Sequence, residues 1–169
     1  MNTNTPRQNH PSPYSTRNQT LALIGWLALC FAASGSAIFI TTGSWYASLL
    51  KPSWNPPAWV FGPAWSLLYT MMAVAAWLIW REGGWKKQRR ALGLFLAQLL
   101  LNALWTPLFF GLHNPALAFA EIVVLWLVLA TTLRSFWLVK KAAGLLLVPY
   151  LAWTTFAAAL NFAIWRLNV

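Results

Sequence analysis

Apolar residues are concentrated in five long runs, which short stretches rich in polar residues separate. The runs cover about 21–42, 58–80, 91–111, 115–137 and 143–166. Each reaches the roughly 20 residues that an α-helix needs to cross a hydrocarbon core about 30 Å thick. The sequence lacks the shorter, alternating segments of a membrane β-barrel. The pattern therefore predicts an all-α fold, an integral membrane bundle of five transmembrane helices.

Residues 1–20 precede the first run and are rich in Asn, Ser, Thr and Pro. We expect them to form a disordered polar tail, and residues 21–169 to form one membrane domain. The start of the chain does not read as a signal peptide, because the first apolar run is longer than the roughly 7–15 residues of a signal-peptide core.

The overall composition favours a membrane protein over soluble alternatives. Hydrophobic residues make up 59% of the 169 residues and charged residues only 8%, whereas soluble domains carry about 25% charged residues. The aromatic content of 16%, including 13 tryptophans, excludes a disordered chain. Buried helices of a soluble protein are a poor alternative, since five nearly uncharged runs leave almost no surface for water.

The net charge of +10 arises from twelve basic and two acidic residues. The basic residues lie between the apolar runs, where they orient a chain in the bilayer, so we expect no nucleic-acid partner. With five crossings, ten of the twelve share the face of the N-terminus, and Lys51 and Arg166 lie on the other. The positive-inside rule then predicts a multi-pass protein of the bacterial cell membrane with a cytoplasmic N-terminus.

No motif of a soluble enzyme is present in the sequence. His10 and His113 are too far apart along the chain to predict a metal site, and the single cysteine, Cys30, cannot form an internal disulfide. Glu82 and Glu121 do not suggest paired-carboxylate catalysis. Glu121 lies inside an apolar run, and an acidic residue in a membrane segment is by default a candidate for a functional role. The alternatives are that it lies near the membrane–water interface or that its carboxyl is protonated. We expect no metal and no required cofactor.

The connection from Thr41 to Pro57, TTGSWYASLLKPSWNPP, is longer than a tight turn requires. It combines Trp45, Tyr46 and Trp54 with three prolines, which stiffen the backbone. Two interpretations remain open. The aromatic residues form a belt at the level of the lipid headgroups, or the connection is a structured lid over a pocket.

Three of the runs each place large aromatic residues and a polar group on one helical stripe. The stripes hold Trp65, Tyr69 and Met72 in the second run, Asn102, Trp105 and Phe109 in the third, and Tyr150, Trp153, Ala157 and Asn161 in the fifth. Polar side chains in lipid turn inward, because an unpaired one costs free energy. Such stripes either fill the bundle or leave a flat-walled cavity suited to a planar, mostly apolar ligand. Pro107 is expected to kink the end of the third run.

Three stretches resemble one known family closely in order and spacing. They are SWYASLLKPSWNPPAWVFGPAW, LLLNALWTPLFFG and PYLAWTTFAAALNFAIWRLN. The chain is similar to the tryptophan-rich sensory protein / translocator protein (TspO/MBR) family, which includes the peripheral benzodiazepine receptor. The likeness runs from about Leu21 to Asn168, and the polar tail lies outside it.

This resemblance implies a five-helix bundle, commonly homodimeric, that binds porphyrins in a pocket under the first loop. In animals the family also binds cholesterol and isoquinoline or benzodiazepine drugs. On the family's pattern, Trp45, Tyr46, Trp54 and Pro57 would form the lid and its hinge. The residues that would line or support the cavity are Trp65, Asn102, Trp105, Tyr150, Trp153 and Asn161.

The expected function is that of a membrane receptor or sensor for protoporphyrin IX, heme-type tetrapyrroles and other flat apolar ligands. The resemblance also implies an alternative, light- and oxygen-dependent breakdown of porphyrin, for which Trp65 and Trp153 are the catalytic candidates. The third alternative is a transporter of porphyrins or sterols. Phe162 stands where the proposed cholesterol motif requires tyrosine, which argues against sterol binding by that route.

A second copy of the chain and the lipid bilayer are the other expected partners. Gly93 and Ala97 form a small-xxx-small pair in the third run, which permits close approach of helices.

Overall fold

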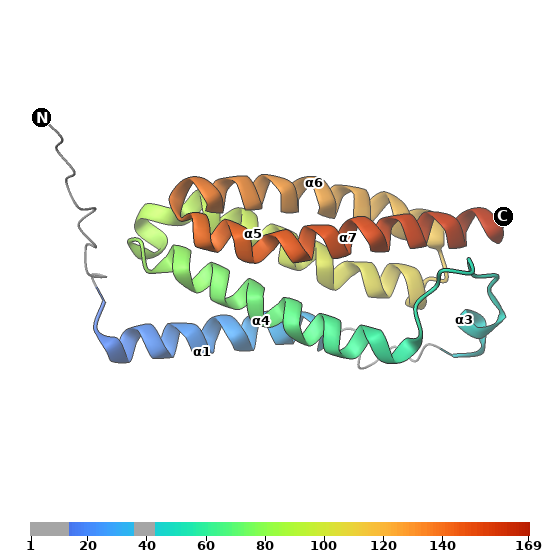
Figure 1. The fold of residues 1–169 in the computed structure, drawn as a ribbon, viewed down its shortest axis with the longest axis horizontal. Helices are drawn as coiled ribbons and strands as arrows, with labels where there is room; N and C mark the ends of the chain where they lie inside the picture. The colour runs from blue at the N-terminus through green and yellow to red at the C-terminus, as the bar shows by residue number, and fades with distance from the viewer. Residues whose placement is uncertain (1–13, 36–42) are drawn as a thin grey trace, which may run out of the picture.

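The computed structural model describes residues 14–35 and 43–169, and every regular element in these ranges is helical. The elements are α1 (Thr16–Ala33), α3 (Ser44–Ser48), the 3-10 helix η1 (Ala58–Val60), α4 (Phe61–Trp80), α5 (Gly84–Thr106), the π-helical η2 (Pro107–Gly111), α6 (Pro115–Val139) and α7 (Lys141–Leu167). The long helices lie side by side (Figure 1). Helix α6 packs against α5 and α7, and α4 packs against α1 and α7.

Among the described residues, four helical segments are long and apolar enough to cross a membrane. They are Ala58–Trp80, Gly84–Gly111, Pro115–Val139 and Lys141–Leu167. They coincide with the second to fifth predicted runs, and α1 is a further helix of 18 residues. The prediction of an all-α membrane bundle is thus confirmed in its coarser form. Residues 1–13 of the expected tail and 36–42 of the first run lie outside the described residues.

Helix α1 begins inside the stretch 1–20 that composition predicts to be a disordered tail. The Ser15 hydroxyl caps the helix, since it accepts a hydrogen bond from the Asn18 backbone N–H at 3.4 Å. The indole N–H of Trp77 on α4 donates to the Gln19 carbonyl at 2.9 Å and holds this turn against the bundle. Capping residues are polar, so a composition argument places the start of such a helix too late.

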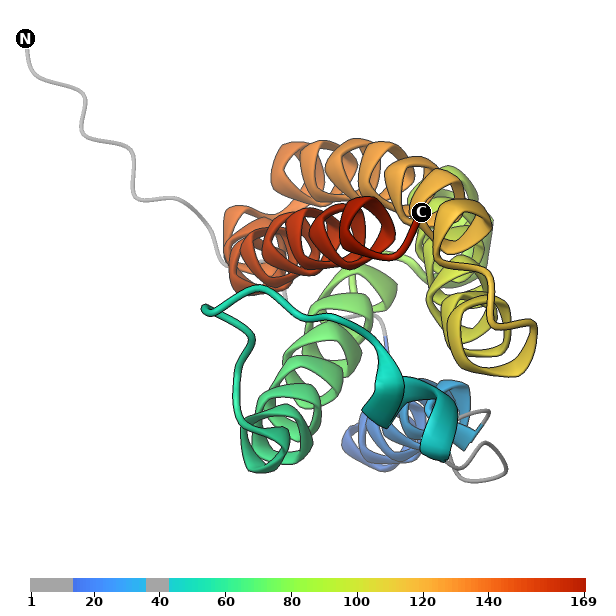
Figure 2. The same cartoon turned by 90° about the vertical axis from the view of Figure 1, so that its right-hand side faces the viewer.

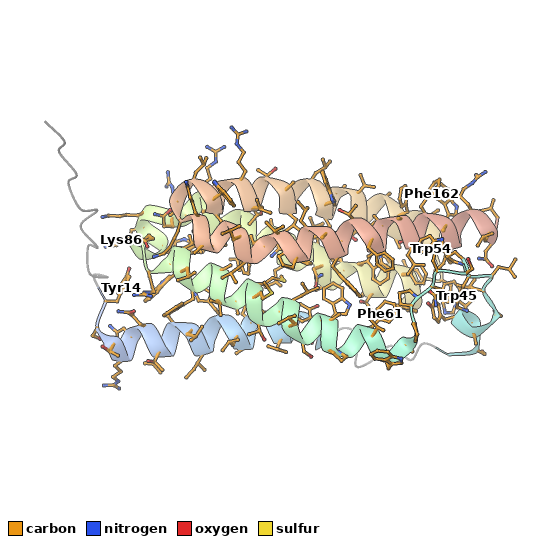
Figure 3. The ribbon with its side chains drawn as sticks, in the orientation of Figure 1. Tyr14, Trp45, Trp54, Phe61, Lys86 and Phe162 are labelled. Atoms are coloured by element: carbon orange, nitrogen blue, oxygen red, sulfur yellow. The ribbon has the colours of Figure 1, made fainter. Side chains whose placement is uncertain are left out.

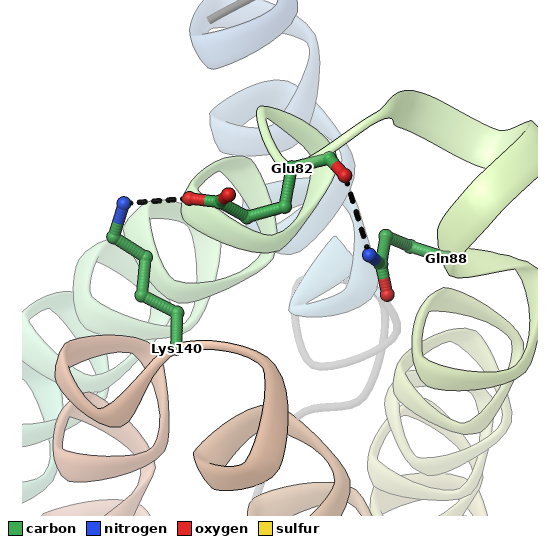
Figure 4. A network of polar contacts seen from close by, with 3 residues as sticks. All are labelled: Glu82, Gln88 and Lys140. Carbon is green, nitrogen blue, oxygen red and sulfur yellow. Dashed lines mark hydrogen bonds and ion pairs between the residues drawn. The ribbon is translucent and has the colours of Figure 1, made fainter. Parts of the chain in front are cut away.

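Helix α5 begins at Gly84, earlier than the apolar run at 91, so the basic residues of this connection lie on its first turns. The turn before it requires glycine at 83, where φ is +122°. Glu82, in the same turn, pairs with Lys140 between α6 and α7 at 2.7 Å, and its carbonyl accepts from the Gln88 amide at 3.3 Å (Figure 4). The pair is partly exposed and therefore contributes little stability.

The third predicted run ends in the distortion that Pro107 leads one to expect. The helix changes there to π-helical turns, and the Leu112 N–H donates to the Pro107 carbonyl at 2.9 Å. Phe109 and Phe110 lie in these π-helical turns. The rings of Trp45 and Tyr46, in the connection between α1 and α4, contact them.

Residues 43–57, which we call the lid, cross one end of the bundle (Figure 2). Trp45, Trp54 and Phe61 gather at this end, whereas Lys86 and Tyr14 lie at the opposite end (Figure 3). The half of the bundle remote from the lid is solidly packed, with Phe95 and Phe136 fully buried and stacked at 5.8 Å.

Candidate functional site

The lid end of the bundle contains a cavity of about 460 Å³. Its lining comes from the end of α1, the lid, α4, α5, η2, α6 and α7. No charged side chain is among the described residues that line it. The predicted site residues in the lining are Tyr46, Trp65, Asn102, Trp105, Trp153 and Asn161.

Aromatic rings give this cavity flat walls. Trp65 on α4 meets Trp153 on α7 nearly at a right angle, with ring centroids 6.4 Å apart. Trp105 on α5 stacks on Phe109 in η2 at 5.0 Å, and both rings are in the lining. The alternative left open by the sequence, complete filling of the bundle by its own aromatic side chains, is therefore wrong for the lid end.

Four predicted site residues are not in the lining. Trp45 stacks on His113, just before α6, with ring centroids 4.3 Å apart, and its ring meets Phe109 of the lining at 5.7 Å. Trp54 is 48% exposed and contacts the Phe156 ring at 5.8 Å. Pro57 is exposed at the start of η1. Trp45 and Trp54 thus contact the lid end of the bundle from outside the cavity.

Tyr150, the fourth, is fully buried behind the cavity wall and belongs to a hydrogen-bonded chain. The Tyr69 hydroxyl donates to Asn102 Oδ1 at 2.8 Å, and Asn102 Nδ2 donates to the Tyr150 hydroxyl at 2.9 Å. This chain ties α4, α5 and α7 together beneath the cavity. The Asn102 amide thus has partners on both sides within the protein.

Asn161 has a similar role nearer the lid. The Trp105 indole N–H donates to Asn161 Oδ1 at 3.1 Å, and Asn161 Nδ2 donates to the Pro115 carbonyl at 2.7 Å. These bonds join α5, α7 and the start of α6. The two asparagines that were predicted to line or support the cavity therefore bond to its aromatic residues, and their amides already have hydrogen-bond partners.

The lid is fastened at two points. The edge of the Tyr46 ring meets Phe110 with centroids 5.3 Å apart, and burial raises the pKa of the Tyr46 phenol, so it stays neutral. Farther along, the Leu50 N–H donates to Asn168 Oδ1 and Asn168 Nδ2 donates to the Leu50 carbonyl, both at 2.9 Å. This reciprocal pair links the lid to the end of α7.

Comparison with known proteins identifies the family of this chain. Residues 21–166 match the TspO/MBR family. The chain belongs to this family. It is 45% identical to the tryptophan-rich protein TspO of Chlorobaculum tepidum over 152 residues, which cover 88% of this chain and 96% of that one. It is 44% identical to protein CrtK of Rhodobacter capsulatus over 153 residues, with 88% and 93% covered.

The translocator protein of Homo sapiens is 43% identical over 126 residues, which cover 73% of this chain and 75% of that one. The resemblance stated from the sequence motifs is thus confirmed. Family membership and the apolar helices together make this TspO/MBR member an integral, multi-pass membrane protein.

Sequence reasoning missed several residues of this family member's site. Asn55 lines the cavity from the lid, and its Oδ1 is buried without a hydrogen-bond partner. Phe156 lies one turn after Trp153 on the same stripe, so a wider stripe would have included it. Asn168 is 118 positions from Leu50, and no local pattern connects two residues at that separation.

Glu121 lies next to the cavity-lining Ile122 on α6 but is not itself in the lining. Both of its carboxylate oxygens are buried without a hydrogen-bond partner, as are both amide atoms of Gln98 on α5. Buried polar atoms without partners reduce stability by about 1–3 kcal/mol each. Glu121 therefore stabilises nothing through the described contacts.

We expect Glu121→Leu to raise stability by about 1–3 kcal/mol, because it removes buried polar atoms that have no partner. Thermal unfolding of the purified protein in detergent measures the change. Glu121→Gln keeps buried polar atoms and should gain less. A lower midpoint for Glu121→Leu would mean that the carboxyl has a stabilising partner.

Proposed function

We propose that this protein is a membrane receptor or sensor that binds porphyrins, such as protoporphyrin IX or heme-type tetrapyrroles, in the cavity beneath the lid. Other flat apolar molecules of similar size belong to the same ligand class. The observation that carries the proposal is the 460 Å³ cavity, which Trp65, Trp105 and Trp153 line with indole rings. Stacking on such rings favours a planar, largely apolar molecule.

The lid gives this receptor a means of responding to its ligand. Tyr46 contributes both to the lid and to the cavity lining, so a bound ring system would contact the lid directly. In our proposal the ligand orders the lid, and the ordered lid is the signal that another component of the membrane reads.

The test is a titration of the reconstituted full chain with protoporphyrin IX, followed by quenching of tryptophan fluorescence. Ala157 lines the cavity, whereas Ala159 on the same helix is exposed. We expect saturable quenching in wild type and in Ala159→Phe, and its loss in Ala157→Phe, whose added ring fills the cavity. Equal binding by the two variants would contradict the site.

A second function, photo-oxidative breakdown of the bound porphyrin, is favoured by the continuity of oxidisable rings. Trp153 contacts Trp65 at 6.4 Å, and Trp65 stacks on Tyr69 at 5.3 Å. The proposed reaction uses O₂ and light, with Trp65 and Trp153 nearest the macrocycle. Illumination of the complex in air would then bleach the porphyrin absorption band faster than in Trp153→Phe. Equal bleaching rates in the two proteins would support binding without breakdown.

For the membrane topology we propose five crossings, with α1 in the first. The basic start of α5 and the lid lie at opposite ends of the bundle (Figure 3), which supports a cytoplasmic N-terminus and an external lid in a bacterial cell membrane. We also propose a homodimer. Gly93 is free of contacts within 4 Å of an added Cβ, and Ala97 is exposed, so this stripe of α5 faces outward.

A further inference from the structure

The charge distribution around the cavity restricts how an acidic ligand can bind. The cavity lining contains no charged side chain among the described residues. The amides of Asn102 and Asn161 already have partners within the protein. A carboxylate taken into this interior would lose its hydration without gaining a counter-charge, which is strongly unfavourable. An ionised group must therefore stay at the lid.

Two basic side chains lie at this end of the bundle, Lys51 in the lid and the exposed Arg166 in the last turn of α7. Lys51 is in contact with a ring of the cavity lining. Its ammonium nitrogen is 4.5 Å from the centroid of the Tyr46 ring, which is part of the lining. Its side chain is partly buried, and it donates to the Leu49 carbonyl at 3.1 Å. The one ion pair among the described residues, Lys140 with Glu82, lies elsewhere, so Lys51 has no carboxylate partner within residues 14–35 and 43–169.

We infer that Lys51 binds a carboxylate on one edge of the proposed ligand at the lid, while the apolar body of the ligand fills the cavity. This inference rests on the proposed function and adds the residue that orients the ligand. The lid then recognises one edge of the ligand by charge, and the rings of the bundle recognise its faces by stacking.

The pairing of Lys51 with a ligand carboxylate differs from a general attraction of acidic ligands to the positively charged protein. Most basic residues lie at the opposite end of the bundle, where Lys86 is exposed (Figure 3). Exposed charges more than about 10 Å apart are largely screened at moderate salt, so those residues contribute little at the lid. Removal of the Lys51 charge should therefore affect acidic ligands selectively, and removal of the Lys86 charge should not.

The experiment compares protoporphyrin IX, a dicarboxylic acid, with its uncharged dimethyl ester in wild type, Lys51→Gln, Lys51→Arg and Lys86→Gln. The quantity of interest is the ratio of the two affinities, which cancels the stronger partition of the ester into detergent when variants are compared. We expect Lys51→Gln to weaken diacid binding about 5-fold relative to the ester, the scale of a partly exposed charge pair. Lys51→Arg and Lys86→Gln should keep the wild-type ratio.

Each other outcome overturns a defined part of the argument. An equal loss for both compounds in Lys51→Gln keeps the wild-type ratio and means that Lys51 acts on the lid through Tyr46 and not on the ligand. Unchanged affinity for both compounds means that Lys51 contributes nothing to binding, and either result overturns the inference. Wild-type protein that binds both compounds with a ratio unaffected by salt also overturns the inference and leaves the proposed function standing. Failure of wild type to bind either compound overturns the proposed function and this inference with it.

Discussion

Trp65→Ala and Trp153→Ala are each expected to weaken protoporphyrin IX binding about 5- to 150-fold. The estimate corresponds to the loss of roughly 1–3 kcal/mol when one indole ring buried against the ligand is removed. Because the two rings meet at 6.4 Å, the double variant should lose less than the sum of the single losses. Fluorescence-quenching titration of the reconstituted protein measures all three affinities.

Trp85→Ala is the matched control for these variants. Trp85 is half exposed at the start of α5 and does not line the cavity. Its replacement should leave the affinity unchanged and report only on the loss of one fluorophore. Wild-type affinity in both Trp65→Ala and Trp153→Ala would remove the cavity as the binding site.

Asn102→Ala is expected to reduce the free energy of unfolding by about 2–4 kcal/mol. The substitution removes two hydrogen bonds and leaves the buried hydroxyls of Tyr69 and Tyr150 without their partner, and each unsatisfied group costs about 1–3 kcal/mol. Denaturant or thermal unfolding in detergent gives the change in stability.

The chain offers a close control one turn earlier on the same helix. Gln98 is as buried as Asn102, but neither atom of its amide has a hydrogen-bond partner. Gln98→Leu should therefore leave stability unchanged or raise it. A loss for Gln98→Leu equal to that for Asn102→Ala would mean that replacing any buried amide on this face of α5 lowers stability, so the hydrogen-bonded chain would not explain the effect.

Helical periodicity predicted which residues share a face, and the family resemblance assigned those faces to a cavity. Trp65, Asn102, Trp105, Trp153 and Asn161 are in the lining of the cavity that the structure contains. Periodicity does not fix how deep the cavity is. Tyr150 shares its stripe with Trp153, yet it lies behind the wall, where the helices approach one another closely.

The lid was less predictable, because its geometry depends on contacts and not on a repeat. Tyr46 faces the cavity while its neighbour Trp45 stacks on His113, and nothing in the sequence distinguishes the two. The hydrogen-bond partners of Asn102 and Asn161 could not be predicted either. An amide that faces the inside of the bundle is expected to form a hydrogen bond, but the sequence does not say with which group. The start of α1 was placed too late because capping residues resemble a polar tail.

The occupied amides of Asn102 and Asn161 have a consequence for the design of compounds that bind this protein. A donor or acceptor added to a compound at their level would have to displace an internal hydrogen bond, so it should gain little affinity. Additional flat hydrocarbon surface meets no such competition. Potency across a chemical series should therefore follow the apolar area removed from water, and calorimetry should record a fall in heat capacity that grows with that area.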